Sequence, residues 1–363
     1  MSWRRTIFEG LVRAVGLFAP SVKEPPAEPR SIFVLRNNDI GDLLVITPLF
    51  EALGKKFPKA EIIAGIGSWN RDVLVDNPNV SRILEINAPW HNQFVRPQGP
   101  IDAVRYIYRS EEVKALQQTR PDFGIDVLGS GFGSLLMMRA RIPYRLGVRG
   151  YAGGDSAVHE SVQYDPTKHV GHQALQFARL LGCEDLPENR PQIFLPKPPR
   201  LGETIVIAPG AGRPEKAWPG AYFAELVRLV GPREKILVIG SEKERDTVIE
   251  ISAGNAMSVG LSLRESFEII ASARLVICNS SMAMHAAAAF RRPAVVLLGK
   301  EYVSASQHRA QWGYPETVIL GKDRDHPEIF TPGEVLEVVR AMLGQLRQQE
   351  CHESEESARG IQG

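Results

Sequence analysis

Short apolar runs alternate with helically periodic stretches along most of this chain. In the first half, the runs predict buried strands, and stretches with apolar residues three and four positions apart predict helices. The predicted strands are Ser31–Leu35, Glu61–Gly65, Arg82–Ile86, Phe123–Val127 and Tyr144–Gly147, and the predicted helices are Leu43–Phe57, Ala103–Thr119, Gly133–Ala140 and Gly171–Leu181. This alternation is typical of a doubly wound α/β domain with a parallel sheet.

The alternation begins again after a proline-rich stretch. The second set of strands is Thr204–Ala208, Lys235–Ile239, Met257–Val259, Leu275–Cys278 and Ala294–Leu298, and the second set of helices is Ala221–Leu229, Glu242–Ile251, Arg264–Ala271, Met284–Phe290 and Pro332–Leu346. We therefore expect an N-terminal segment and linker at 1–30, a Rossmann-like domain at 31–186, a linker at 187–203, a second Rossmann-like domain at 204–345 and a disordered tail at 346–363. Two such domains would face a cleft, where ligand sites tend to form.

The N-terminal segment places its apolar residues, from Ile7 to Phe18, largely on one helical face, with Arg4, Arg5 and Arg13 available for a polar face. This pattern suits a helix that lies in a membrane interface, and equally a helix docked on the protein's own surface. Charged residues interrupt the segment, so it makes a poor signal-peptide core. No apolar run in the chain reaches the length of a membrane span.

Composition narrows the class of protein rather than the activity. The chain has 363 residues and a formal net charge of +1, so no overall field favours nucleic acid. Its three cysteines, Cys183, Cys278 and Cys351, are far apart and have neither zinc-site spacing nor a disulfide framework. That usage suits a reducing compartment, so we expect a cytoplasmic protein.

The turn between Leu35 and Leu43 is the first candidate site. It places Gly41 and Asp42 at the carboxyl end of a predicted parallel strand, where such sheets bind ligands. A carboxylate there can act as a general base. The alternative is that Asp42 only caps the helix that follows.

A second turn follows the strand that ends at Ala208. Small residues at Gly210, Ala211 and Gly212 allow close approach of the backbone to a ligand, and Lys216 can neutralise a departing diphosphate. A tight turn with a solvated lysine is the alternative. The turn lacks both the GxxxxGK[ST] and the GxGxxG pattern, so neither a triphosphatase loop nor a dinucleotide fold is indicated.

Two further strand–turn–helix segments complete the candidates. Glu242 and Glu244 are candidates to bind a ribose, or else are first-turn carboxylates favoured by the helix dipole. Ser280 and Ser281 precede a helix whose first N–H groups can bind an anion, and His285 lies one turn into it. A buried histidine with a structural partner is the alternative for His285.

Two other polar motifs have simpler interpretations. Asp323-Arg-Asp325 has the form that holds metal–nucleotide complexes, but it lies in a late polar loop. His169 and His172 are closely spaced without a further ligand nearby, and we interpret them as a surface feature at a helix start. We expect no metal site.

Taken together, these segments resemble the heptosyltransferase family, the family nine glycosyltransferases of lipopolysaccharide assembly. The resemblance runs from about Ser31 to Gly344. Three landmarks in order carry it: Arg36-x-x-x-x-Gly-Asp42 followed by Thr47-Pro48; Ala208-Pro-Gly-Ala-Gly with Lys216-x-Trp-Pro219; and Asn279-Ser-Ser-Met-Ala-Met-His285 followed by Arg292-Pro293.

The resemblance implies a GT-B fold, an inverting transfer, no essential metal and no cofactor beyond a nucleotide-sugar substrate, ADP-heptose. Asp42 matches the family's catalytic carboxylate and Lys216 the lysine at the donor diphosphate. Glu242 or Glu244 matches the acidic residue near the ribose, and Leu261 the backbone that lines the nucleobase pocket. The third landmark, with Ser280, Ser281, Met282 and His285, matches the segment near the donor phosphates.

The chain departs from the family pattern on the donor side. The family commonly has Asp and Gly where this chain has Ser280 and Met282, and often Gly-Pro-Thr where it has Gly299-Lys300-Glu301. A different nucleotide-sugar in envelope polysaccharide synthesis and a non-catalytic GT-B binding protein therefore stay open as alternatives.

Several arginines of the first half are candidates to bind the acceptor. Guanidinium groups pair bidentately with phosphate or carboxylate, which suits a phosphorylated or carboxylated glycolipid core. The candidates are Arg36, Arg139, Arg141, Arg145 and Arg149. A solvated basic face is the alternative. An interfacial N-terminal helix would hold such an enzyme at the cytoplasmic face of the inner membrane.

Overall fold

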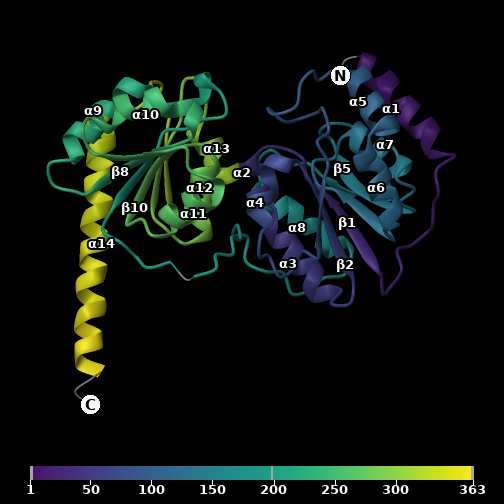
Figure 1. The fold of residues 1–363 in the computed structure, drawn as a ribbon, viewed down its shortest axis with the longest axis horizontal. Helices are drawn as coiled ribbons and strands as arrows, with labels where there is room; N and C mark the ends of the chain where they lie inside the picture. The colour runs from purple at the N-terminus through teal and green to yellow at the C-terminus, as the bar shows by residue number, and fades with distance from the viewer. Residues whose placement is uncertain (1–2, 198, 361–363) are drawn as a thin grey trace. The chain divides into compact units, whose positions relative to one another are not determined.

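The computed structural model describes residues 3–197 and 199–360, without the side chains of Arg4, Arg5 and residues 350–360. The chain divides into two compact units, Met1–Pro196 and Lys197–Gly363. Each unit holds one six-stranded sheet flanked by helices (Figure 1). The division falls inside the proline-rich stretch 187–203.

The sheet of the first unit has the strand order β3-β2-β1-β4-β5-β6, with every neighbouring pair parallel. Its strands are β1 (Ser31–Leu35), β2 (Glu61–Ile66), β3 (Arg82–Glu85), β4 (Phe123–Asp126), β5 (Tyr144–Arg149) and β6 (Glu160–Gln163). The chain order reverses direction between β1 and β4, where Leu35 pairs with Asp126. Ligands of open parallel sheets bind at such a switch point, outside the carboxyl ends of the strands.

Helices cover both faces of this sheet. They are α1 (Trp3–Gly16), α2 (Ile40–Leu44), α3 (Thr47–Lys56), α4 (Arg71–Leu74), α5 (Pro100–Arg109), α6 (Glu111–Thr119), α7 (Gly131–Arg139) and α8 (Val170–Leu180). Two predicted helices are each divided in two. Leu43–Phe57 breaks before Pro48, which suits the first turn of α3, and Ala103–Thr119 breaks at Ser110, whose Oγ accepts from the N–H of Val113 at 3.2 Å to begin α6.

The second unit repeats the first topology. Its strand order is β12-β11-β10-β7-β8-β9, again parallel throughout, with the switch point between β7 and β10. The strands are β7 (Ile205–Ala208), β8 (Ile236–Gly240), β9 (Ala256–Val259), β10 (Leu275–Asn279), β11 (Ala294–Leu297) and β12 (Thr317–Leu320). The helices are α9 (Gly220–Val230), α10 (Arg245–Ser252), α11 (Leu263–Ala271), α12 (Met282–Ala289), α13 (Ala305–Trp312) and α14 (Pro332–Gly360).

The ends of both sheets differ from the sequence prediction. The edge strands β6 and β12 and the helix α13 were not predicted. At the C-terminus, α14 continues to Gly360, through most of the segment that we expected to be disordered (Figure 1). Glu and Gln are the commonest residues of that segment, and both have a good intrinsic helix propensity.

The helix α1 is docked on the first unit. Val12 is buried, and the ring of Phe8 lies 4.8 Å from that of Phe132 on α7. Val12 belongs to a core that also holds Phe33 and Leu35 of β1 and Leu136 of α7, and Phe8 packs against that core. The side of α1 that carries Phe8 and Val12 is therefore docked on the protein's own surface, which was one of the two alternatives for the N-terminal segment. Within residues 3–197 and 199–360, no helix is long and apolar enough to cross a bilayer.

Candidate functional site

The switch point of the first sheet holds a paired carboxylate and guanidinium. Arg36 directly follows β1, and Asp42 lies in the first turn of α2. The Arg36 Nη2 donates to Asp42 Oδ1 at 3.0 Å, and its Nε donates to the Asp42 carbonyl at 3.2 Å. The guanidinium is almost fully buried, whereas the Asp42 side chain keeps 29% of its surface exposed. The pair therefore presents an oriented, accessible carboxylate.

Asp42 does not cap a helix. The N-cap of α2 is Asp39, and α3 begins after Ile46. Asp39 also accepts from the N–H of Gln93 at 3.1 Å through its Oδ1, which fastens the loop 90–98 beside this turn. The capping alternative for Asp42 is thus excluded, and the carboxylate is left for another role.

Three buried asparagines surround this turn, and the sequence pattern does not distinguish them from other polar residues. Asn37 and Asn38 follow β1, and Asn70 follows β2; all three are nearly fully buried. The carbonyl of Asn38 accepts from Trp69 Nε1 and Asn70 Nδ2, both at 2.9 Å. Asn37 Nδ2, Asn38 Oδ1 and Asn70 Oδ1 have no partner among the residues that the structure describes. Buried polar atoms normally have partners, so these three are available to a ligand.

Asp126 is a second missed residue of this switch point. It ends β4 beside Leu35, and its carboxylate accepts from the N–H groups of Gly129 at 3.0 Å and Ser130 at 2.8 Å. Burial raises the pKa of Asp126 to about 6, although the two N–H groups and the charge of Arg36 oppose the rise. A lone Asp after an apolar run gives no sign of its burial, so the sequence carried no clear signal.

The predicted acceptor arginines are separated from Asp42 by the topology. Arg139 and Arg141 precede β5, and Arg145 is its second residue, whereas Asp42 follows the carboxyl end of β1. Tyr144 of β5 pairs with Phe123 of β4, which pairs with Ile32 near the start of β1. Because the strands are parallel, these three arginines lie toward the amino ends of the strands. Of the five candidate arginines, Arg36 and Arg149 are the two at the carboxyl ends of the strands.

Arg145 in addition has a different role. Its guanidinium is buried and donates to the carbonyls of Pro20 at 2.8 Å, Ile142 at 2.7 Å and Ala157 at 3.0 Å. It fastens the segment after α1 to the sheet, so it is neither an acceptor ligand nor part of a solvated face. The sequence interpretation is corrected on both points.

In the second unit, Asn279 joins the two strands of the switch point. It ends β10 and is fully buried. Its Oδ1 accepts from the N–H of Trp218 at 2.8 Å, and its Nδ2 donates to the carbonyl of Pro209 at 2.5 Å. One side chain thus fixes both ends of the turn that contains Gly210, Ala211, Gly212 and Lys216.

Lys216 is held at this edge by its backbone. It ends the short turn Pro214–Lys216, and its carbonyl accepts from the N–H of Gly299 at 3.1 Å. A Cβ at Gly299 would lie 2.3 Å from the carbonyl oxygen of Ala217, so only glycine fits there. The close approach of the β11 loop therefore positions the lysine backbone while its side chain stays partly exposed.

The turn after Asn279 also has defined partners. Ser281 is the N-cap of α12, which begins at Met282, and Ser280 Oγ lies 2.8 Å from Nε2 of His308. Burial first, and then the charge of Lys216, lower the pKa of His308 to about 4. Ser280 therefore faces a neutral imidazole at pH 7.

His285 is deeply buried. Its Nδ1 lies 2.7 Å from the hydroxyl of Tyr314, and the ring of Trp312 lies beside it. These contacts are those of a histidine with a structural partner, so the alternative interpretation has direct support. The donor role of His285 stays a prediction.

The two candidate ribose carboxylates are both engaged. Glu242 forms a two-point ion pair with Arg245, with both N–O distances at 2.7 Å. Glu244 accepts from the N–H and Oγ of Ser241, and its Oε1 would lie 2.5 Å from a Cβ at Gly210. Glu244 is thus beside the turn of β7, and Glu242 lies near Gly260, which precedes Leu261.

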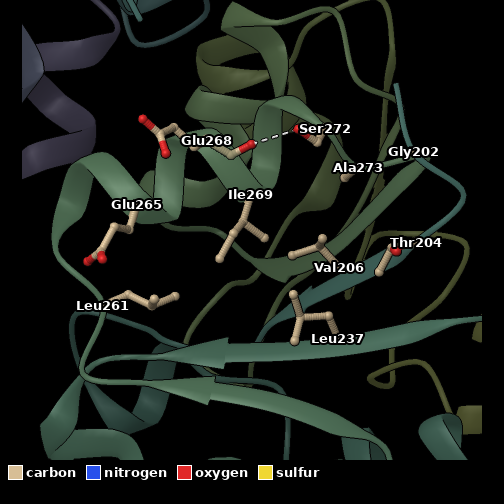
Figure 2. Close-up of a pocket in the computed structure, with 10 residues that line it drawn as sticks. All are labelled: Gly202, Thr204, Val206, Leu237, Leu261, Glu265, Glu268, Ile269, Ser272 and Ala273. Atoms are coloured by element: carbon tan, nitrogen blue, oxygen red, sulfur yellow. Dashed lines mark hydrogen bonds between the residues drawn. The ribbon is translucent and has the colours of Figure 1, made fainter. Parts of the chain in front are cut away.

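A cavity of about 490 Å³ lies between α11 and the sheet of the second unit (Figure 2). Val206, Leu237 and Ile269 give it an apolar lining, and Leu261 is at one side. Of the predicted donor residues, Leu261 alone contributes to it. The cavity is therefore a separate feature from the turn that carries Lys216.

The two remaining polar motifs have structural roles. Asp323 accepts from the N–H of Ser306 at 2.8 Å and so fastens the start of α13. His169 is the N-cap of α8, with Nδ1 accepting from the N–H of Gly171 at 3.1 Å, but it is buried rather than on the surface. In the described part of the chain, no cluster of three or more His, Cys, Asp or Glu side chains could hold a metal ion.

A family model described as glycosyltransferase family 9 (heptosyltransferase) matches residues 111–322. Lipopolysaccharide heptosyltransferase 2 of Escherichia coli K12 is 25% identical over 354 residues, covering 86% of this chain and 98% of that protein.

Solved structures show the same fold. A family 9 glycosyltransferase from Veillonella parvula superposes with a TM-score of 0.71 at 17% identity, over 87% of this chain and 98% of that one. The Escherichia coli heptosyltransferase WaaC with ADP superposes with a TM-score of 0.68 at 16% identity, over 87% and 99%. The predicted fold class, GT-B with two Rossmann-like parallel sheets, is confirmed.

Proposed function

This chain belongs to glycosyltransferase family 9, the heptosyltransferases, and from that premise we propose that it transfers a heptose from ADP-heptose to a lipopolysaccharide-core or related glycolipid acceptor. The relatives named above support the substrates: one is a lipopolysaccharide heptosyltransferase, and another was solved with ADP. The proposal covers a single displacement with inversion and without an essential metal.

The observation that carries the mechanism is the Arg36–Asp42 pair. Arg36 occupies Oδ1 of the carboxylate, and Oδ2 has no hydrogen-bond donor among the described residues. Oδ2 takes the proton of an acceptor hydroxyl as that oxygen attacks the anomeric carbon. The bond from that carbon to the diphosphate oxygen breaks on the opposite side, so the configuration inverts and a nucleoside diphosphate leaves.

The residues around Lys216 support departure of the diphosphate. Negative charge develops on the leaving group, and Lys216 together with the N–H groups at the start of α12, after Ser281, would stabilise it. Backbone N–H groups of Gly210, Ala211 and Gly212 add donors on the same turn. Such a set of donors performs the task that a metal ion performs elsewhere.

The nucleoside part of the donor has its own candidate contacts. Leu261 would line the nucleobase pocket, and Glu242 or Glu244 would bind the ribose. Glu242 pairs with Arg245, and Glu244 with Ser241, so the two carboxylates can be removed independently. Calorimetry with ADP on Glu242→Ala and Glu244→Ala therefore tests the two assignments one at a time. The variant that loses ADP affinity identifies the ribose contact.

Acceptor contacts are proposed for the asparagines of the first switch point. Sugar hydroxyls donate and accept hydrogen bonds, and Asn37, Asn38 and Asn70 each offer one buried atom without a partner in the described chain. With Arg139, Arg141 and Arg145 away from this edge, Arg149 is the exposed arginine that remains to meet an acceptor phosphate. A lipid-linked acceptor would place the enzyme at the cytoplasmic face of the inner membrane.

Binding of a panel of nucleoside diphosphates and nucleotide sugars, measured by calorimetry on wild type and Lys216→Ala, tests the function. A preference for ADP or ADP-heptose that the variant loses is the expected result. A preference for another nucleotide would mean that the donor is a different nucleotide-sugar. The Ser280–His308 contact, at a position where the family commonly has Asp, is the observation that favours this second outcome. Absence of binding would indicate a non-catalytic GT-B protein.

A further inference from the structure

Two helices of the first unit expose apolar side chains in periodic rows. On α1 and the turn after it these are Trp3, Ile7, Leu11, Val15 and Phe18, and on α5 they are Ile101, Val104 and Tyr108. Leu11 is 61% exposed, Ile101 74% and Phe18 89%. Scattered exposed apolar residues are normal, but rows at helical spacing are not. We refer to these eight residues as the α1–α5 surface.

Both helices pack on the same neighbour, so their outer faces both point away from it. Phe8 on the inner side of α1 contacts Phe132 of α7. Trp90 contacts both Phe132, at 5.6 Å between ring centroids, and Tyr106 on the inner side of α5, at 5.7 Å. Figure 1 shows α1 and α5 on the α7 side of the sheet. The two apolar rows therefore belong to one side of the unit.

The exposed charges on the two helices themselves are positive, among the side chains that the structure describes. Arg105 and Arg109 on α5 are exposed, and Arg13 on α1 is 61% exposed with Asp155 only at 4.0 Å. The acidic residues of the two helices are only partly exposed: the Glu9 carboxylate lies against Gly153, and Asp102 accepts from the N–H of Gly99 at 3.0 Å at the start of α5. Among the described side chains of α1 and α5, the charged residues classed as exposed are therefore all arginines, and they flank the apolar rows.

We propose that the α1–α5 surface docks on an anionic lipid bilayer, with its apolar rows in the headgroup–acyl boundary and its arginines on lipid phosphates. Interfacial helices have this combination of an apolar face and basic flanks. The inference rests on the proposed function, because a lipid-linked acceptor is presented at such a bilayer. It deepens that function by assigning the membrane contact to two helices rather than to the N-terminal segment alone.

Flotation of the full chain with vesicles tests the assignment. The vesicles contain phosphatidylethanolamine and the anionic lipid phosphatidylglycerol, whose surface attracts basic segments, and phosphatidylcholine vesicles serve for comparison. Wild type should float with the anionic vesicles and less with the neutral ones. Leu11→Glu and Ile101→Glu should each lower the bound fraction about tenfold or more, because a charge replaces an apolar side chain that the bilayer would bury.

Leu180→Glu is the matched control. Leu180 ends α8 in the same unit and is also exposed, but it lies outside the α1–α5 surface. It should float like wild type. Equal loss in all three variants, no loss in Ile101→Glu, or no binding by wild type would overturn the proposal. A dimer in light scattering that Ile101→Glu dissociates would assign the surface to a second copy of the chain and also overturn it.

ADP calorimetry on the same proteins keeps this test apart from that of the proposed function. Leu11 and Ile101 belong to the first unit, whereas Lys216 belongs to the second, so Leu11→Glu and Ile101→Glu should bind ADP like wild type. Loss of vesicle binding with intact ADP binding supports the docking surface. Vesicle binding by a wild type that binds no nucleotide would leave the surface in place and remove the transferase proposal.

Discussion

The guanidinium of Arg36 holds Asp42 at two points, with Nη2 on the Oδ1 carboxylate oxygen at 3.0 Å and Nε on the backbone carbonyl at 3.2 Å. The ion pair is buried on the arginine side and open on the aspartate side. It thus fixes the direction of the second carboxylate oxygen, which is the geometry that a general base requires.

Asp42→Asn should abolish most turnover while donor binding is kept. The amide cannot accept a proton, and removal of a general base costs roughly a hundredfold to ten-thousandfold in rate. Turnover with a glycolipid acceptor and ADP affinity by calorimetry are the two measurements. Unchanged turnover in this variant would remove Asp42 as the base.

Arg36→Gln should lower kcat about tenfold to a hundredfold with little change in donor affinity, since the carboxylate remains but loses its fixed direction. Arg36→Lys should recover part of the loss, because it restores a charge without the two-point contact. A purely structural role predicts instead that kcat per folded molecule stays constant while the melting temperature falls.

Lys216→Ala should weaken ADP binding and lower kcat about a hundredfold or more, as expected when one donor to a developing oxyanion is removed. Lys235→Ala is a suitable control, because Lys235 is an exposed lysine of the same unit paired with Glu203. Equal effects of the two substitutions would mean that general charge, and not the position of Lys216, governs donor binding.

Gly299→Ala should disturb the donor turn through the backbone. The new Cβ would lie 2.3 Å from the Ala217 oxygen, so the Pro214–Trp218 segment must shift, at a cost of about 1–3 kcal/mol in the free energy of unfolding. ADP affinity should fall with it. Gly220→Ala, where a Cβ meets nothing within 4 Å, is the matched control and should be neutral or slightly stabilising.

Stability should fall between pH 7 and pH 5 partly because of His308. The pKa of His308 is about 4 in the folded protein against 6.5 for an unperturbed histidine, so the unfolded chain takes up a proton in this window and the folded one does not. The contribution is about 2 kcal/mol of unfolding free energy lost over that range. Urea unfolding at the two pH values should show a smaller difference for His308→Gln than for wild type; equal differences would contradict the shift.

The sequence predicted those site residues that follow one another along the chain, and it did not predict those that only the fold brings together. Both switch-point turns were found because an apolar run, a glycine and a charged residue follow in order. The arginines before β5 were misplaced, because a basic cluster does not reveal which edge of the sheet it occupies. Asp126 and Asn70 were missed because burial of a single polar residue depends on distant elements, and the polar edge strand Glu160–Gln163 lacks an apolar run.

The docking of α1 has a practical consequence for anyone who expresses this enzyme. A shortened chain that starts at Ser31 would strip Phe8 and Val12 from the core and uncover Phe132. It would also take away the Pro20 carbonyl from the buried guanidinium of Arg145 and the Ser21 hydroxyl from His159. Truncation of the N-terminus would therefore yield a protein that is less stable and more prone to aggregation. Leu11→Glu, in contrast, changes the outer face of α1 and leaves its inner face intact.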